Sequence, residues 1–484
     1  MGKDVVQAEF TRRDRMRYRQ KLRRCLDTFA KMLSQVRFDG DRMLTGLEIE
    51  LNLVDELAGP AMVNSEVLGD LEDPAFQVEM GRFNLELNVA PRLISHDGLI
   101  AYEQEILARL LRADERASRS HAQVALIGIL PTLTAEQAVF ANISANPRYF
   151  VLNEQIIGAR GEDMVLDIEG VERLSMSLDS IAAEAACTAV QFHIQVAPDQ
   201  FADYWNASQA IAAVQVAVGA NSPFLFGRRL WDETRIALFQ QSTDTRPDEL
   251  KAQGVRPRVW FGERWISSSL DLFVENVKYF SPLLPVCEEE EPGEVLAAGG
   301  IPQLAELRLH NGTVYRWNRP VYDIGLGGQP HLRVENRVLP SGPTVIDTIA
   351  NAALYFGLTR SLVEDEQPLW STMPFEVAER NFYRAARQGI GTILSWPGAG
   401  DVPVTGLVLD ELLPRAYAGL DLLNVAPAIR DRLLGVIEGR CKVGSNGASW
   451  QVRAASRPRM TLAAMLRQYR ELMHSNVPTH EWPT

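Results

Sequence analysis

Alternation of polar and apolar positions predicts β-strands in the first two thirds of the chain. In residues 43–54, Glu48 and Glu50 alternate with leucine and isoleucine. Successive side chains of a strand point to opposite faces, so both carboxylates lie on one face of this strand. Tight turns are expected at Gly81-Arg82 and at 325–330. Alternation, or a short apolar run, predicts further strands at 75–80, 83–90, 122–130, 188–196, 305–310, 313–318 and 330–338.

Helical periodicity occupies much of the remaining chain, and residues 134–180 have no clear period. Helices are predicted at 8–36, 96–118, 198–220 and 230–241, and almost throughout from Thr344 to the last one at Leu462–Met473. Strands joined by hairpins, without regular alternation of strand and helix, indicate an α+β protein with a mostly antiparallel sheet. We expect a core of sheet and helices in residues 1–344, including the N-terminal helix, and a helical region in residues 345–484 packed on it.

The composition indicates a globular protein and argues against some partners. The 484 residues include 49 basic and 62 acidic side chains, a net charge of −13, which is unfavourable for non-specific binding of nucleic acid or an anionic membrane. The N-terminus lacks the apolar core of a signal peptide, and no run of about 18 apolar residues occurs. The cysteines show no CxxC pairing, which favours a reducing compartment, and we expect a cytoplasmic location.

Several predicted strands carry an unusual set of polar side chains on one face. They are Glu48 and Glu50; Glu79, Asn84, Glu86 and Asn88; Gln191, His193 and Gln195; and Arg333, Glu335 and Arg337. Each set alone is typical of the wet face of an antiparallel sheet. Together they contain ligands of hard cations and arginines suited to phosphate, and divalent cations are the simplest compensation for so many carboxylates.

Oxygen donors with one histidine and no thiolate cluster favour Mg²⁺ or Mn²⁺ over zinc. Since Mg²⁺ recruits substrate phosphates as ligands, the pattern predicts a site with several metal ions that handles phosphate on one face of the sheet. The chain has no G-x-x-x-x-G-K-[ST] and no G-x-G-x-x-G motif. A bound nucleotide would therefore be held by metal ions and arginines.

Four motifs together resemble the glutamate–cysteine ligases, and more closely the bacterial carboxylate–amine ligases. They are G-x-E-x-E at 46–50, L-E-L-x-x-A-P at 85–91 with an acid seven residues before its glutamate, H-N-G-T-V-Y-R-W-N-R-P at 310–320 and R-V-E-N-R-V-L-P-S-G-P-T at 333–344. The resemblance extends from about residue 40 to about residue 370. It implies a curved antiparallel sheet like the catalytic domain of glutamine synthetase, with helices on its convex side and ATP and magnesium ions in its hollow.

The resemblance also implies a reaction, in which ATP phosphorylates a carboxylate and an amine attacks the acyl phosphate to give an amide. The expected donor is the γ-carboxylate of glutamate, and the acceptor is cysteine or another amine. By motif, Arg337, Glu50 and Glu86 would be catalytic, and Arg337 with Arg333 would bind the phosphates of ATP. The implied magnesium ligands are Glu48, Glu50, Glu79, Glu86, His193 and Glu335.

The substrate contacts are less specific. Residues 134–165 or 322–330 could cover the acyl phosphate. Close relatives often have His-x-His where this chain has Gln191-Phe192-His193. This departure leaves the identity of the amine undetermined. Cations are needed for the carboxylates of an amino acid, and each arginine could equally be structural. The candidates for substrate binding are Arg308, Arg316, Arg319, Arg148 and Asn88.

Two other functions remain open from the residues. The same metal-lined hollow would suit a metal-dependent phosphohydrolase or a phosphagen-type kinase. A non-catalytic relative that binds nucleotide is the third possibility, although a decayed site has no reason to keep paired carboxylates. The expected partners are small molecules, an amino acid and an amine, and the chain could form a homo-oligomer.

Overall fold

The central sheet is built from antiparallel neighbours, as the hairpin pattern predicted. The computed structural model describes residues 9–40 and 42–483, and within these ranges seven strands form the sheet in the order β12–β13–β7–β1–β3–β2, with β4 also paired to β1. All of these pairings are antiparallel. The strands are β1 Thr45–Val54, β2 Phe76–Val78, β3 Asn84–Arg92, β4 Gln123–Ala125, β7 Ala189–Val196, β12 Asn318–Ile324 and β13 Pro330–Pro340.

The register places the polar side chains of neighbouring strands side by side. Glu50 lies opposite Glu86, and Glu335 lies opposite His193. Glu48 is flanked by Asn88 on β3 and by Gln191 on β7. Because the side-chain period of a strand is two, this register puts the apolar residues of the same strands together on the other face.

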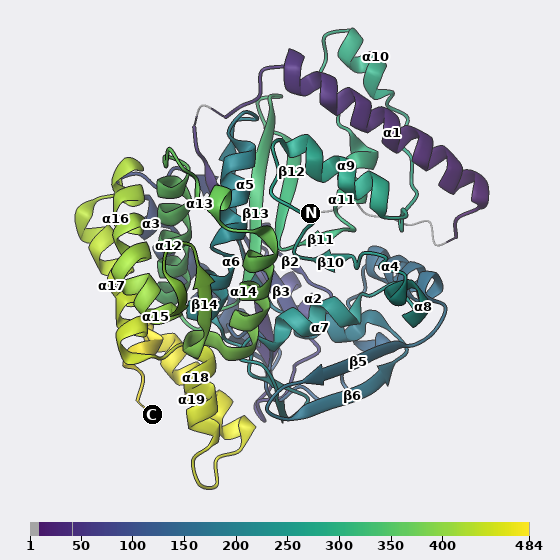
Figure 1. The fold of residues 1–484 in the computed structure, drawn as a ribbon. Helices are drawn as coiled ribbons and strands as arrows, with labels where there is room; N and C mark the ends of the chain where they lie inside the picture. The colour runs from purple at the N-terminus through teal and green to yellow at the C-terminus, as the bar shows by residue number, and fades with distance from the viewer. Residues whose placement is uncertain (1–8, 41, 484) are drawn as a thin grey trace.

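Helices cover the apolar, convex face of the curved sheet. The helices α5 (Phe201–Ala210), α6 (Ala212–Gly219) and α12 (Val345–Leu362) pack against β7 and β13 (Figure 1). The ring of Phe192 on β7 stacks on Tyr355 of α12, with the ring centroids 6.0 Å apart. Since α12 is buried around nearly its whole circumference, it belongs to the same hydrophobic core as the sheet. The predicted division at residue 344 stays a prediction.

The remaining helices surround this core. The helix α1 (Arg12–Gln35) begins with a capping box between Thr11 and Asp14 and packs on three helices near β12, namely α9 (Ser269–Tyr279), α10 (Pro292–Ala297) and α11 (Ala305–Asn311). Among the described residues, no helix has the length and apolar character needed to cross a membrane. Other helices are α2 Asn64–Leu71, α3 Gly98–Ser118, α7 Thr234–Ser242, α8 Asp248–Ala252, α14 Phe375–Gln388, α16 Leu413–Leu422, α17 Pro427–Val443, α18 Gly447–Ala455 and α19 Leu462–Ser475.

Three strand predictions differ from the structure. The predicted strand at 305–310 is wrong, because this segment is α11, whose buried residues recur with helical spacing. The predicted strand at 122–130 ends at Ala125, where the chain leaves the sheet and approaches Pro340 so closely at Gly128 that a Cβ there would lie 2.6 Å from the proline Cβ. Of the predicted strand at 313–318, only the short strand β11 (Tyr315–Arg316) lies wholly inside the range, and it pairs in parallel with β10 (Val259–Trp260).

The segment without a clear period, 134–180, holds α4 (Pro147–Arg160) and a hairpin of β5 (Met164–Glu169) and β6 (Arg173–Leu178). The strand β12 was not predicted either, because Pro320 is an unusual residue within a strand. The C-terminal region is mostly helical, as predicted, but includes a hairpin of β14 (Ile393–Trp396) and β15 (Gly400–Pro403). The predicted helix start at residue 8 and the outer limits of the predicted domains, residues 1 and 484, lie outside the described residues.

Candidate active site

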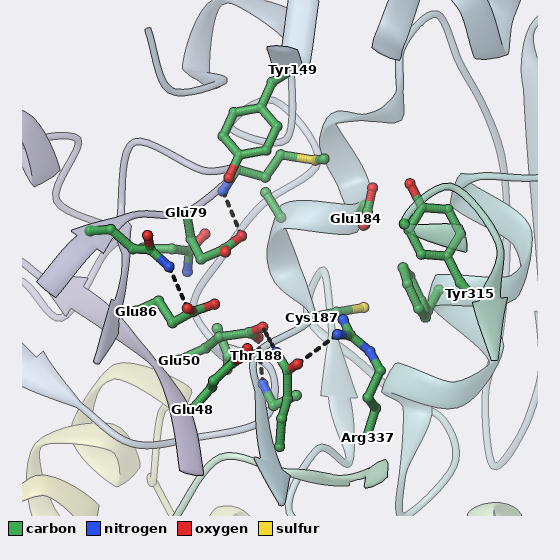
Figure 2. A pocket seen from close by; sticks show the side chains of 18 of the residues that line it. Glu48, Glu50, Glu79, Glu86, Tyr149, Glu184, Cys187, Thr188, Tyr315 and Arg337 are labelled. Atoms are coloured by element: carbon green, nitrogen blue, oxygen red, sulfur yellow. Dashed lines mark hydrogen bonds between the residues drawn. The ribbon is translucent and has the colours of Figure 1, made fainter. Parts of the chain in front are cut away.

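A cavity lies on the polar face of the sheet, opposite the helices of the core. Its volume is about 330 Å³, and its floor is formed by side chains of β1, β3, β7 and β13. The helix α4 and the 3₁₀ helix η2 (Ile181–Ala186) contribute to its walls (Figure 2). Of the residues that the sequence predicted, those that line it are Glu48, Glu50, Glu79, Glu86, Arg148, Arg319, Arg333, Glu335 and Arg337.

Three carboxylates converge at one end of this cavity. One oxygen each of Glu50, Glu79 and Glu86 lie within 4.8 Å of one another. Adjacent strands position Glu50 and Glu86, while Glu79 follows β2 and its Oε2 accepts a hydrogen bond of 3.0 Å from the backbone N–H of Met80. We call these three residues the acidic triad.

Burial makes the ionised acidic triad unfavourable without a cation. Burial raises the pKa of Glu50 to about 8, and the neighbouring Glu79 adds to this shift. Burial likewise raises the pKa values of Glu79 and Glu86. A cluster of carboxylate oxygens with no thiolate or imidazole is the donor set that a hard divalent cation such as Mg²⁺ prefers. The triad therefore fits the predicted metal.

A second group of charged residues, Glu48, His193 and Glu335, lies beside the triad. Nε2 of His193 is 3.1 Å from Oε1 of Glu48. Burial opposes the ionisation of Glu48, but His193 lowers its pKa to about 2. Burial also opposes the ionisation of Glu335, but Arg319 and Arg337 hold its pKa below the ordinary value. Glu48 and Glu335 therefore favour the ionised form, whereas the triad resists full ionisation.

Arg337 connects the two groups of acids. Its Nη1 donates a hydrogen bond of 2.6 Å to Oε1 of Gln191 and another to Glu335. The side-chain amide of Gln191 in turn donates to Oε1 of Glu50 at 3.0 Å. The pairing of β13 with β7 shifts register between Asn336 and Leu339, and Arg337 lies at this irregularity. A β-bulge of this kind re-aims a side chain, here into the cavity.

The structure separates the predicted substrate-binding residues. Arg319 lines the cavity and donates to both oxygens of Glu335, at 2.8 and 2.9 Å. Asn88 donates to Oε1 of Glu86 at 2.9 Å. Arg316 points elsewhere: it is buried, donates to Oε2 of Glu275 at 2.8 Å and is not among the residues that line the cavity. The geometry gives no support for a substrate role of Arg316.

A second cavity, with a volume of about 840 Å³, adjoins the first. Residues that line both are Arg148, Gly312, Arg319 and Arg333. Arg308 lines only the second, where its Nη2 donates to Asp323 at 2.6 Å. The two cavities thus adjoin at a wall that carries Arg148, Arg319 and Arg333, and the acidic triad lines only the first.

Sequence reasoning missed some residues of the cavity wall. Glu184 on η2 lines the cavity together with Tyr149 of α4. The only signal for Glu184 was a single glutamate within an alanine-rich stretch, IAAEAAC. The residue Tyr149 lies within 134–165, one of the two segments expected to cover the site, and that role stays a prediction.

Comparison with known proteins supplies a family and a fold. The model of the glutamate–cysteine ligase family 2 (GCS2) matches residues 44–445. Among solved structures, the chain is similar to a glutamate–cysteine ligase of Francisella tularensis in complex with AMP, with a TM-score of 0.57 and 12% identity over 90% of each chain. A bifunctional glutathione synthetase of Pasteurella multocida gives a TM-score of 0.48 and 9% identity over 95% of this chain and 55% of that one. No curated protein matches the chain in a search by sequence.

These findings confirm the family and the fold that the motifs predicted. The family match spans every strand of the central sheet, and the Francisella structure shares the architecture of a curved antiparallel sheet covered by helices. The strands that carry the acidic triad and Arg337 lie within the matched residues. The chain belongs to the glutamate–cysteine ligase family 2 and is an ATP-dependent carboxylate–amine ligase.

Proposed function

We propose that the enzyme joins the γ-carboxylate of glutamate to the amino group of cysteine or another amine, through an acyl phosphate formed with ATP and Mg²⁺. The observation that carries this proposal is the convergence of the acidic triad with Arg337 in one cavity. A carboxylate that attacks a triphosphate must approach several negative charges. Metal ions and a fixed arginine are the groups that offset this repulsion as the phosphoryl group is transferred.

The metal ions would be held by the two groups of acids. The acidic triad would bind one ion, and Glu48, His193 and Glu335 would bind a second, with Mn²⁺ able to replace Mg²⁺ at oxygen donors. When bound, these ions supply neutralisation of charge at the phosphate oxygens. The raised pKa values of Glu50, Glu79 and Glu86 support the triad, because a cation would favour the ionised form that burial disfavours.

The arginines would bind the phosphates of ATP. Arg337 presents a planar guanidinium that suits the oxygens of the transferring phosphoryl group, and Arg333 lies two residues before Glu335 on the same face of β13. The second cavity supports a position for the nucleotide, because it is large and meets the first at Arg319 and Arg333. We propose that the base and ribose of ATP occupy the second cavity and that the phosphates extend into the first.

The proposal is tested by measuring ADP release for a panel of carboxylates crossed with a panel of amines, with product identification by mass. We expect ADP release to require both substrates. The variant Glu86→Gln should lower kcat/KM more than about 100-fold, since it removes one ligand and one charge from the triad. The matched control, Glu154→Gln, changes an exposed glutamate on α4 and should retain full activity.

The unfolding temperature of Glu86→Gln should be equal to or higher than that of the wild type without metal, because burial raises the pKa of Glu86. Full activity of this variant would refute the assignment of the triad. ADP release that requires neither an amine nor a carboxylate would favour the phosphohydrolase. Release with an amine and formation of a phosphorylated amine would favour the phosphagen-type kinase, and binding of Mg·ATP without turnover would favour the non-catalytic relative.

A further inference from the structure

A carboxylate on the cavity wall has no role in the site described above. Glu184 lies on the 3₁₀ helix η2, just before β7, and its side chain lines the cavity. Figure 2 shows its carboxylate between the metal-binding end, marked by Glu79, and the phenol ring of Tyr315. Glu184 is therefore placed where a bound substrate would meet it.

The carboxylate of Glu184 has no partner among the described residues. No hydrogen bond or ion pair to either of its oxygens occurs in the parts of the chain that the structure describes, and its Oε2 is buried. The other acids of the cavity differ, since Glu50 accepts two hydrogen bonds and Glu335 accepts those of two arginines. Glu184 is half-buried, but a buried carboxylate oxygen without a partner is unfavourable, and a ligand in the cavity would complete it.

We propose that Glu184 binds the ammonium group of a substrate and thereby selects for substrates that carry one. This inference rests on the proposed function, and it adds a residue that determines specificity. The ammonium group could come from either of two sources, the α-amino group of the carboxylate donor or the amine acceptor before it loses its proton.

The surroundings of Glu184 suit a cation. The rings of Tyr149 and Tyr315 line the same cavity, and aromatic faces attract ammonium groups. Burial raises the pKa values of both tyrosines, so their hydroxyls stay neutral and can accept hydrogen bonds from the cation. Burial also raises the pKa of Glu184 to about 8, and the negative charge of Glu79 raises it further. A bound cation would offset this shift.

The distribution of charge in the cavity fits an amino acid or an acyl phosphate with a nearby amine. Arg337 and Arg319 provide positive charge on β13 and β12, and the carboxylate of Glu184 lies on the wall formed by η2. A substrate with a phosphorylated carboxylate and an ammonium group would therefore be oriented by both ends. Such two-point binding would hold the reacting atoms close together.

The test compares wild type, Glu184→Gln and the control Glu154→Gln with two pairs of compounds. L-Glutamate is compared with glutarate, which lacks the ammonium group, and L-cysteine is compared with hydroxylamine, a nucleophile that is neutral near neutral pH. Calorimetric titration measures binding in the presence of Mg²⁺ and a non-hydrolysable ATP analogue, and ADP release measures KM and kcat.

We expect Glu184→Gln to weaken binding of an ammonium-bearing compound at least about tenfold, with no loss of affinity for the analogue that lacks the ammonium group. A loss of affinity confined to L-glutamate would show that Glu184 binds the carboxylate donor. A loss confined to L-cysteine would show that it binds the amine acceptor. Equal affinities of wild type and Glu184→Gln for both ammonium compounds would overturn the inference. So would a wild type that binds neither compound better than its analogue.

Because the titration does not depend on turnover, it separates this inference from the proposed function. If the wild type lacks amine-dependent ADP release but still binds the ammonium compound more tightly than Glu184→Gln does, only the proposed reaction is refuted. The unfolding temperature of Glu184→Gln should be unchanged or higher, since no partner within residues 9–40 and 42–483 is lost. A marked fall in the unfolding temperature would indicate a structural role and overturn the inference. The variant Glu184→Asp keeps the charge on a shorter side chain, so its affinity for the ammonium compound should be intermediate.

Discussion

At the scale of single residues, the chemistry of the cavity depends on how each buried charge is paired. Arg337 contacts both Gln191 and Glu335, and burial, which alone would lower its pKa, is outweighed by the neighbouring Glu335 and Glu50. Arg316, in another of the four motifs, is more deeply buried and pairs with Glu275 outside the cavity. Two arginines that each pair with a buried glutamate therefore have different expected functions.

The pair offers a matched prediction. Arg337→Lys keeps the charge but loses the planar fork, so we expect kcat/KM to fall about 100-fold. Arg316→Lys should leave kcat/KM within a few-fold of the wild type while lowering the unfolding temperature, because the buried hydrogen bonds to Glu275 and Asn276 are weakened. Steady-state ADP release and thermal unfolding of both variants measure these effects. Full activity of Arg337→Lys would contradict the role of Arg337.

At the scale of elements, the hairpin between β2 and β3 positions two of the three acids of the triad. Gly81 lies in the turn, and a Cβ there would be 2.4 Å from Oδ1 of Asn84 and 3.0 Å from Cβ of Ala185. A side chain at residue 81 would therefore clash within the hairpin and crowd η2, which favours glycine at this position. The turn therefore fixes Glu79 relative to Glu86 and also sets the distance to the helix that carries Glu184.

We expect Gly81→Ala to lower the free energy of unfolding by about 1–3 kcal/mol, because the added methyl group would clash with Asn84 and crowd Ala185 of η2. Activity should fall as well, since Glu79 moves with the turn. Gly327→Ala is the control, because a Cβ at that position in the turn between β12 and β13 meets nothing within 4 Å. Denaturant unfolding and ADP release test both variants, and equal stabilities would show that the turn can adapt.

At the scale of the whole molecule, one apolar core holds the helices on the sheet, while the opposite face concentrates acidic side chains. The triad makes the stability of the metal-free protein depend on pH. For Glu50 the folded-state pKa is about 8, above the ordinary value of 4.5. Between these values the unfolded chain has released a proton that the folded protein retains, so stability decreases as pH rises.

We therefore expect the unfolding temperature of the metal-free protein in EDTA to fall from about pH 4.5 to about pH 8. Glu48 has a lowered pKa of about 2, so its stabilising contribution is lost only as pH falls well below this window. Added Mg²⁺ should raise the unfolding temperature more at pH 8 than at pH 5, because the ionised triad binds it. A calorimetric series across pH, with and without Mg²⁺, tests this, and a metal-free stability that increases with pH would contradict it.

The alternation of β1, β3, β7 and β13 allowed their faces to be predicted, because a period of two is a local property of the chain. It also identified which acids share a face. The segment 305–310 misled the same reasoning, since leucines two residues apart fit a strand as well as part of a helix, and only packing against α1 and α9 decides between them.

The sequence by itself determined the α+β class, the family and the set of acids and arginines on one face of the sheet, because strand periodicity and local motifs encode them. The tertiary structure alone decided that Glu50, Glu79 and Glu86 converge, that Arg316 points away and that Glu184 in the cavity wall has no partner among the residues described. These facts depend on register, on turns and on contacts between segments distant in the chain. The free energy of such contacts is set by packing in three dimensions, and no local pattern records it.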